Sequence, residues 1–188
     1  MKEAQDWVRA IAAVMTIATF VGSLTVADQI WHARSSSGIE YFPLGLGLLC
    51  RNTWMLYGYT AGEYTVMCVN ACGFALAVFI SREHRAFSPD TKHDGTVMLW
   101  LVLMNIFFPW SSAVELGKLA VILAVISDLQ PVLRICRKAP LPYTAAWTLA
   151  TSGLWTLYGV LSWNECIFLG HIVGVLVAAA ELILAVWV

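Results

Sequence analysis

The chain has 188 residues, of which 60% are hydrophobic and only 12% are charged. Soluble globular domains average roughly 45–50% apolar and about 25% charged residues, so this composition excludes an ordinary soluble domain and indicates a membrane protein. The formal net charge is -1, which lacks the strongly basic character of a nucleic-acid-binding protein, so we predict no nucleic-acid partner.

Seven apolar runs are long enough to cross about 30 Å of hydrocarbon, which takes roughly 20 helical residues. They lie near residues 8–30, 41–58, 64–81, 96–111, 116–135, 143–161 and 165–187. The hydrophilic stretch from Ser81 to Gly95 separates the third span from the fourth and predicts a solvated loop. We find no convincing signal-peptide cleavage site, so the first span is expected to remain in the mature protein. The seventh span runs almost to Val188, which leaves open whether a native C-terminal tail is missing.

The basic residues predict the orientation. With the N-terminus outside, seven basic residues fall on the cytosolic side and three on the outer side, as the positive-inside rule requires. The seven are Arg34, Arg82, Arg85, Lys92, Arg134, Arg137 and Lys138, and the three are Lys2, Arg9 and Lys118. We therefore expect the loop 81–95 and the C-terminus to lie in the cytosol.

Five cysteines lie in or at the edge of apolar segments, namely Cys50, Cys68, Cys72, Cys136 and Cys166. They have no CxxC spacing and no paired histidines, so packing is a better interpretation than a metal site or a disulfide. We predict no metal and no cofactor.

An internal duplication is the strongest pattern in the sequence. The run Trp54-Met55-Leu56-Tyr57-Gly58 recurs 101 residues later as Trp155-Thr156-Leu157-Tyr158-Gly159, and Gly73 recurs at the same offset as Gly174. An aromatic belt at the membrane interface would explain the residue types. It would not explain the matched order and offset.

The repeated motif lies in span two and again in span six, so the two halves cross the membrane in the same direction. Three spans per half leave span four as a linker. We therefore predict an all-α membrane protein with seven transmembrane helices, arranged as two parallel three-helix repeats joined by a linker helix (3+1+3). The predicted parts are 1–95 for the first repeat with its cytosolic loop, 96–111 for the linker helix and 112–188 for the second repeat.

These residues resemble the SWEET sugar transporters, a family that has the 3+1+3 plan and a Trp-x-x-Tyr-Gly motif in each half. SWEETs are examples of transporters with parallel repeats. The matching positions of the first half are Arg34, Ser35, Ser36, Pro43, Trp54, Tyr57, Gly58, Asn70 and Gly73. Those of the second half are Ser127, Lys138, Pro142, Trp155, Tyr158, Gly159 and Gly174. The resemblance covers most of the chain from about Phe20.

The resemblance implies that Trp54, Trp155 and Asn70 bind the sugar. The residue chemistry points the same way, because a sugar needs a flat apolar face for its C–H surface and hydrogen-bonding groups for its hydroxyls. For Asn70 the alternative is a hydrogen bond that only joins helices. Cys50 and Arg51, about one turn before Trp54, complete the substrate-binding set of the first half.

His171 stands 101 residues after Asn70, where the family has a second asparagine, and joins the predicted substrate-binding residues. A buried imidazole is expected to be neutral at neutral pH and to gain a positive charge on acidification. We therefore predict that uptake of a neutral sugar falls at acidic pH. A packed, permanently neutral histidine is the alternative.

Several residues are predicted to act in gating. In the family, prolines of spans one and five serve as hinges, but span one here has no proline and span five has Pro131, three residues beyond the expected place, which is now Asp128. Asp28 and Asp128 lie towards the inner ends of these spans and are candidates for an inner gate, with hydrated helix ends as the alternative. The predicted gating set is Pro43, Pro131, Pro142, Asp28, Asp128, Tyr57 and Tyr158. Glu181 has no partner predictable from the sequence.

The resulting prediction is a facilitative carrier of mono- or disaccharides that works by alternating access and is not an enzyme. No GxxxxGK[ST] motif is present, and a lone histidine with scattered serines is a poor catalytic set. The alternatives are a PQ-loop-type amino-acid carrier of an organelle membrane, which Arg51 would suit, and a non-transporting receptor on the same scaffold. We expect the plasma membrane first and Golgi or other vesicle membranes next, with lipid and a sugar as partners. A homo-oligomer is left open.

Overall fold

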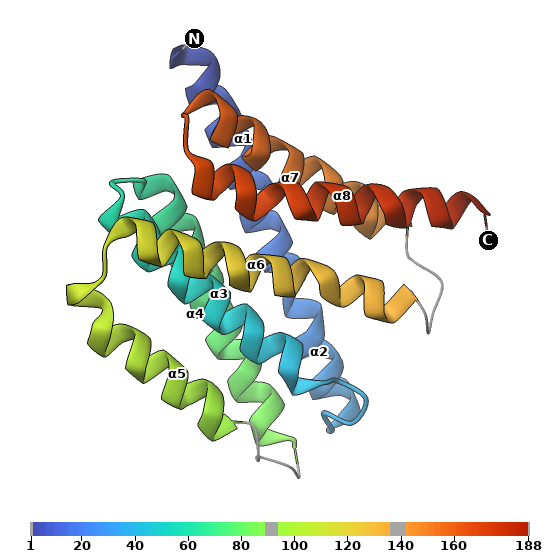
Figure 1. Ribbon diagram of the computed structural model, residues 1–188. Coiled ribbons are helices and arrows are strands. Elements are labelled where there is room, and N and C mark those ends of the chain that lie inside the picture. The colour runs from blue at the N-terminus through green and yellow to red at the C-terminus, as the bar shows by residue number, and fades with distance from the viewer. Residues whose placement is uncertain (1, 89–93, 136–141, 188) are drawn as a thin grey trace. The chain divides into compact units, whose positions relative to one another are not determined.

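The computed structural model describes residues 2–88, 94–135 and 142–187, which form helices joined by short connections (Figure 1). Side chains are described for these residues except 94, 130–135, 142, 186 and 187. The helices are α1 (Lys2–Gly22), α2 (Leu24–Ala33), α3 (Tyr41–Thr60), α4 (Tyr64–Ala86), α5 (Asp94–Phe107), the 3-10 turn η1 (Phe108–Trp110), α6 (Ala113–Ile135), α7 (Pro142–Leu161) and α8 (Glu165–Trp187). Five residues of the sequence analysis lie outside the described residues, namely Lys92, Cys136, Arg137, Lys138 and Val188, as do the side chains of Pro131, Arg134 and Pro142.

Each of the seven predicted spans is helical, and the first is interrupted. α1 ends at Gly22 and α2 begins at Leu24, with Ser23 between them. The Ser23 hydroxyl donates a hydrogen bond to the carbonyl of Phe20 at 2.5 Å, and the hydroxyl of Thr25 donates to the carbonyl of Gly22 at 2.9 Å. Glycine–serine pairs are known sites of helix distortion. Span one therefore has an irregular point without the proline that the family would place there.

The prediction that residues 81–95 form a solvated loop is wrong at both ends. α4 continues to Ala86, and α5 already begins at Asp94. Ser81 and His84 are buried, and an imidazole nitrogen of His84 hydrogen-bonds the carbonyl of Ile39 at 2.8 Å. A buried polar side chain that is hydrogen-bonded is compatible with a packed helix, so the polar composition of this stretch did not end the helix.

Length and hydropathy alone identify three apolar helical stretches that could cross a membrane among the described residues. They are Lys2–Ala33, Tyr64–Ala86 and Glu165–Ala185, and Gly95–Trp110 is a shorter apolar helix. α3 and α7 carry the repeated Trp, Tyr and Gly, and α3 also contains Arg51, which lowers its mean hydropathy. The duplication therefore supports α3 and α7 as spans independently of their hydropathy.

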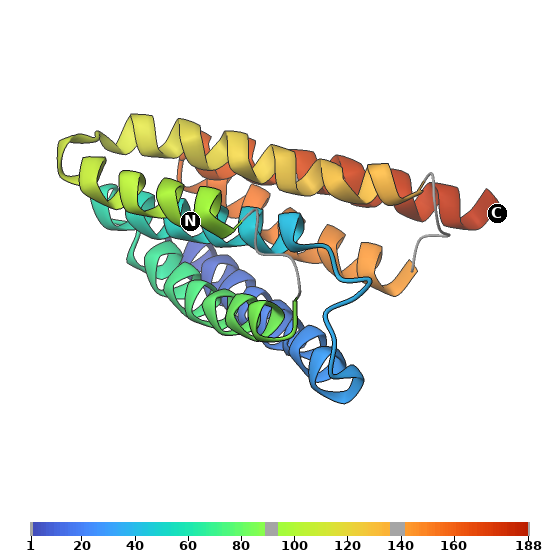
Figure 2. The ribbon, with the colours of Figure 1, turned by 90° about the horizontal axis from the view of Figure 1, so that it is seen from below.

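Contacts between residues divide the chain into two compact units, Thr16–Leu116 and Met1–Met15 with Gly117–Val188. In the first of these, α3 packs along α4, while α2 lies against α4 and α5 lies against α3. In the second, α7 packs along α8. Figure 2 shows both helix pairs, and the α5 helix beside α3, from a second direction. The predicted boundaries 1–95, 96–111 and 112–188 stay a prediction.

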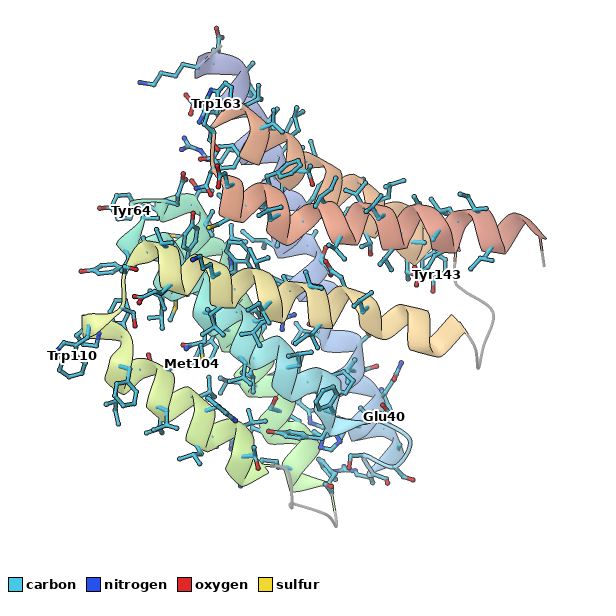
Figure 3. All side chains as sticks on the ribbon, viewed as in Figure 1. Glu40, Tyr64, Met104, Trp110, Tyr143 and Trp163 are labelled. Carbon is cyan, nitrogen blue, oxygen red and sulfur yellow. The ribbon has the colours of Figure 1, made fainter. Side chains whose placement is uncertain are left out.

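Large apolar side chains cover the outward faces of the helices. On α5, Val102 and Ile106 are exposed, and on α8 Leu176 and Ile183 are exposed. Soluble monomers rarely expose contiguous apolar surface of this kind. Exposed aromatic residues mark the helix ends, as Figure 3 shows for Tyr64 at the start of α4 and Trp110 in η1. Tyrosine and tryptophan collect at membrane–water interfaces, so these faces and ends fit a protein embedded in lipid.

Candidate functional site

The α3–α4 hairpin and the α7–α8 hairpin are built alike, residue by residue. Each turn has three residues, 61–63 in one and 162–164 in the other. The bond from Ala61 N to Tyr57 O is 2.8 Å, and its equivalent from Ser162 N to Tyr158 O is 2.9 Å. Likewise Met67 N bonds Glu63 O and Phe168 N bonds Asn164 O, both at 3.0 Å. The offset of 101 residues is therefore preserved in the backbone hydrogen bonds.

The glycine of the repeated motif allows the two helices of each hairpin to approach closely. A Cβ atom on Gly58 would lie 2.5 Å from the backbone nitrogen of Met67, and one on Gly159 would lie 2.6 Å from that of Phe168. Both neighbours are backbone atoms at the start of the next helix, and they cannot move without moving that helix. Glycine is thus required at the fifth position of the motif in both halves.

The tryptophan and tyrosine of the motif pack on each other within their helix. Trp54 and Tyr57 meet edge to face with ring centroids 5.4 Å apart, and Trp155 and Tyr158 do so at 5.8 Å. Spacing of three residues brings side chains to the same helix face. All four side chains are buried, Tyr158 almost completely. The two tyrosines therefore support the tryptophan rings predicted to bind substrate.

The predicted polar residues differ between the halves. Asn70 on α4 is half-buried, and its side-chain amide donates a hydrogen bond to the carbonyl of Val66 one turn earlier at 2.9 Å. His171 on α8 is also half-buried, and its ring stacks on Trp155 with centroids 5.8 Å apart and an interplanar angle of 18°. The structure thus brings together Trp155 and His171, two residues predicted to bind substrate.

Arg51 is a charged residue within α3. The carbon at the centre of its guanidinium lies 4.6 Å from the centroid of the Phe20 ring. Its Nε is buried and has no hydrogen-bond partner, and no ion pair joins Arg51 to the described part of its unit. An arginine at a helix centre costs about 2.5–3.5 kcal/mol in translocon-insertion experiments. A cation–π contact stabilises a protein by about 0.5–2 kcal/mol, so the contact with Phe20 offsets only part of the cost of placing the arginine there.

The repeated glycines, Gly73 and Gly174, have different neighbours. A Cβ atom on Gly73 would clash with the ring of Phe20. One on Gly174 would lie 2.7 Å from the hydroxyl oxygen of Ser152 and 2.9 Å from a carboxylate oxygen of Asp128. Ser152 is the second-half equivalent of Arg51 in the offset of 101. The first half thus places an aromatic ring beside its glycine, with the guanidinium of Arg51 over the same ring, and the second half places a hydroxyl and a carboxylate there.

Comparison with known proteins agrees with this architecture. A family model described as "Sugar efflux transporter for intercellular exchange" matches residues 6–81. Sugar transporter SWEET1 of Xenopus laevis is 27% identical over 83% of this chain and 82% of its own length. Sugar transporter SWEET1 of Danio rerio is 23% identical over 93% of this chain and 87% of its own length.

A solved structure of a eukaryotic SWEET transporter, 18% identical, superposes with a TM-score of 0.83 over 97% of this chain and 95% of its own. The chain is therefore similar to SWEET transporters in sequence and shares their fold. The fold prediction is thereby confirmed, namely two three-helix repeats and a linker helix.

Within this SWEET fold the predicted gating residues occupy different environments. Asp28 on α2 is exposed and forms an exposed ion pair with His32 at 3.3 Å, whereas Asp128 on α6 is half-buried beside Gly174. Pro43 lies in the first turn of α3, and Cys50 is half-buried on the same helix. Among the described residues, no group of three or more His, Cys, Asp or Glu side chains could hold a metal ion.

Sequence reasoning missed Phe20, Ser152 and Asn52. Asn52 is almost fully buried, and its side-chain nitrogen has no hydrogen-bond partner among the residues that the structure describes. Its position in an apolar span, beside Arg51, was a usable signal because polar groups in spans are costly. The offset of 101 could have identified Ser152 from Arg51. Phe20 carries no such signal, since it is one of many apolar residues in span one.

Proposed function

We propose that this protein is a facilitative transporter of mono- or disaccharide sugars that works by alternating access and is driven by the substrate gradient. The observation that carries the proposal is the pair of matched hairpins, each with a Trp-x-x-Tyr-Gly motif beside a polar side chain, in a SWEET fold. The relatives are named sugar transporters, and the amino-acid carrier and the receptor are not favoured by them.

We further propose that Trp54, Asn70, Trp155 and His171 bind the sugar. The stack of His171 on Trp155 supports this, because it combines an aromatic face with a hydrogen-bonding group as sugar recognition requires. Asn70 supplies an amide in the other half. We assign the protein no enzymatic activity, and we place it in the plasma membrane, with vesicle membranes as the second choice.

The test is uptake by the purified protein in liposomes. A radiolabelled neutral hexose, a disaccharide and a neutral amino acid are offered separately, each with and without a concentration gradient, and empty liposomes serve as the control. We expect sugar uptake that saturates, shows no net accumulation above the outside concentration and needs no nucleotide. Amino-acid uptake without sugar uptake would contradict the proposal and favour the PQ-loop alternative.

A further inference from the structure

Arg51 is held in place inside the first-half hairpin by two neighbours. On one side its guanidinium lies over the ring of Phe20, with the carbon 4.6 Å from the ring centroid. On another side is Gly47, where a Cβ atom would lie 2.5 Å from a terminal guanidinium nitrogen. Any larger residue at position 47 would displace the guanidinium. The fold thus makes room for this charge within α3.

The charge of Arg51 lacks an anionic partner in the part of its unit that the structure describes. The two ion pairs found among the described residues join Arg9 to Asp6 and His32 to Asp28. The buried Nε of Arg51 has no hydrogen-bond partner either. A guanidinium has five N–H donors in a planar fork that matches a carboxylate or phosphate. The ring of Phe20 is not a conventional hydrogen-bond acceptor, so it does not satisfy these N–H donors.

Arg51 lies on the same part of the hairpin as the proposed sugar-binding residues. It precedes Trp54 by three residues on α3, which places both on one helix face. Its neighbour Phe20 also contacts the position of Gly73, which follows Asn70 by three residues on α4. A chain of contacts therefore runs from the guanidinium through Phe20 to the helix face that carries Asn70.

We propose that the first-half site binds an anionic sugar, whose carboxylate or phosphate group pairs with Arg51. This inference rests on the proposed sugar transport and specifies its substrate class. Trp54 and Asn70 would hold the sugar ring, and Arg51 would provide the two parallel N–H donors of its fork to the anionic group. The equivalent residue of the second half is Ser152, which is neutral, so the second half does not repeat this arginine.

The experiment compares three substrates of one size class in liposomes: glucose, glucuronate and glucose 6-phosphate. The wild type is measured with Arg51→Gln and with Arg82→Gln, which removes an exposed positive charge from α4 of the same unit. We expect the wild type to take up glucuronate or glucose 6-phosphate. In Arg51→Gln we expect the rate of that uptake to be at least about tenfold lower. Arg82→Gln should keep it. The two anions distinguish a carboxylate site from a phosphate site.

A second measurement needs no variant and covers the case in which Arg51→Gln does not fold. In the wild type, the preferred anion should inhibit glucose uptake at concentrations at least about tenfold lower than unlabelled glucose does. Arg51→Lys keeps a charge without the fork, and we expect it to retain part of the anion uptake.

Two results would overturn the inference and leave the proposed function intact. One is glucose uptake that neither anion inhibits. The other is a folded Arg51→Gln variant that carries the anion as well as the wild type does. Failure to move any of the three sugars would contradict the proposed function itself, and the two failures are thereby distinguishable.

Discussion

The α3–α4 and α7–α8 hairpins differ where their side chains are polar and agree where their backbones touch. Gly58 and Gly159 leave nearly identical space for the following helix, and the Trp–Tyr pairs adopt the same edge-to-face geometry. By contrast, Arg51 corresponds to Ser152 and Asn70 to His171. The shared glycines and tyrosines build the hairpins, and we expect the differing polar residues to set the chemistry of each half.

The largest effect on folding is expected when the shared glycine is replaced. Gly58→Ala and Gly159→Ala each put a methyl group against the backbone of the next helix, so each should destabilise the protein by about 3 kcal/mol, at the upper end for overpacked cores. Thermal unfolding in detergent measures this. Gly153→Ala on α7 is the control, since no described neighbour outside its own helix turn lies within 4 Å of its Cβ position and alanine favours the helix by about 1 kcal/mol. Equal stability of Gly58→Ala and wild type would show that the hairpin can open.

The next effect is on transport and tests the polar positions of the first half. Asn70→Ala should lower sugar uptake about tenfold or more, because the amide would no longer bind a sugar hydroxyl. Its stability should change little, since the amide bonds only a carbonyl of its own helix. Asn105→Ala removes a matched bond, from Asn105 to the carbonyl of Leu101 at 2.8 Å on α5, and should leave uptake unchanged. If Asn70→Ala took up sugar as fast as Asn105→Ala, Asn70 would not belong to the sugar-binding site.

The third prediction sharpens the contrast between Asn70 and His171. Acidification from about pH 8 to about pH 4 should lower uptake of a neutral sugar, because His171 gains a proton as the pH falls. Protonation converts the accepting ring nitrogen into a donor, so an acceptor for a sugar hydroxyl is lost. His171→Asn should be active with a flat profile over this range. Identical pH profiles of the two proteins would show that His171 is a packing residue.

The smallest effect concerns the turns, where Gly62 and Trp163 are equivalent. Both residues have a left-handed backbone conformation, with φ of 72° and 55°. This conformation destabilises a non-glycine residue by about 1–2 kcal/mol. Trp163 is 89% exposed, so Trp163→Gly loses little packing and should raise stability by about 1 kcal/mol. Thermal unfolding measures the change, with Trp110→Gly, in which the exposed tryptophan has no left-handed backbone, as the comparison. A loss of stability would indicate that Trp163 anchors the turn at the membrane interface.

Apolar runs and the repeat offset were sufficient to predict seven helices and the 3+1+3 plan, because both follow from the thickness of a bilayer and from duplication. The offset also paired His171 with Asn70 correctly in the hairpin. It could not predict that α4 continues through His84, since the hydrogen bond to Ile39 joins residues 45 positions apart. Local polarity predicts a loop wherever such distant partners are unknown.

The sequence by itself determined that this chain is helical, embedded in a membrane and built from two equivalent halves. Those properties depend on composition, on the length of apolar runs and on the repeat offset, all of which can be read along the chain. Only the tertiary structure decided that Arg51 lies over Phe20, that His171 stacks on Trp155 and that Asp128 and Ser152 meet at Gly174. These contacts join different helices, and each depends on how two helices are rotated about their axes as they pack. The spacing of residues along one helix does not predict how that helix is rotated against its neighbour.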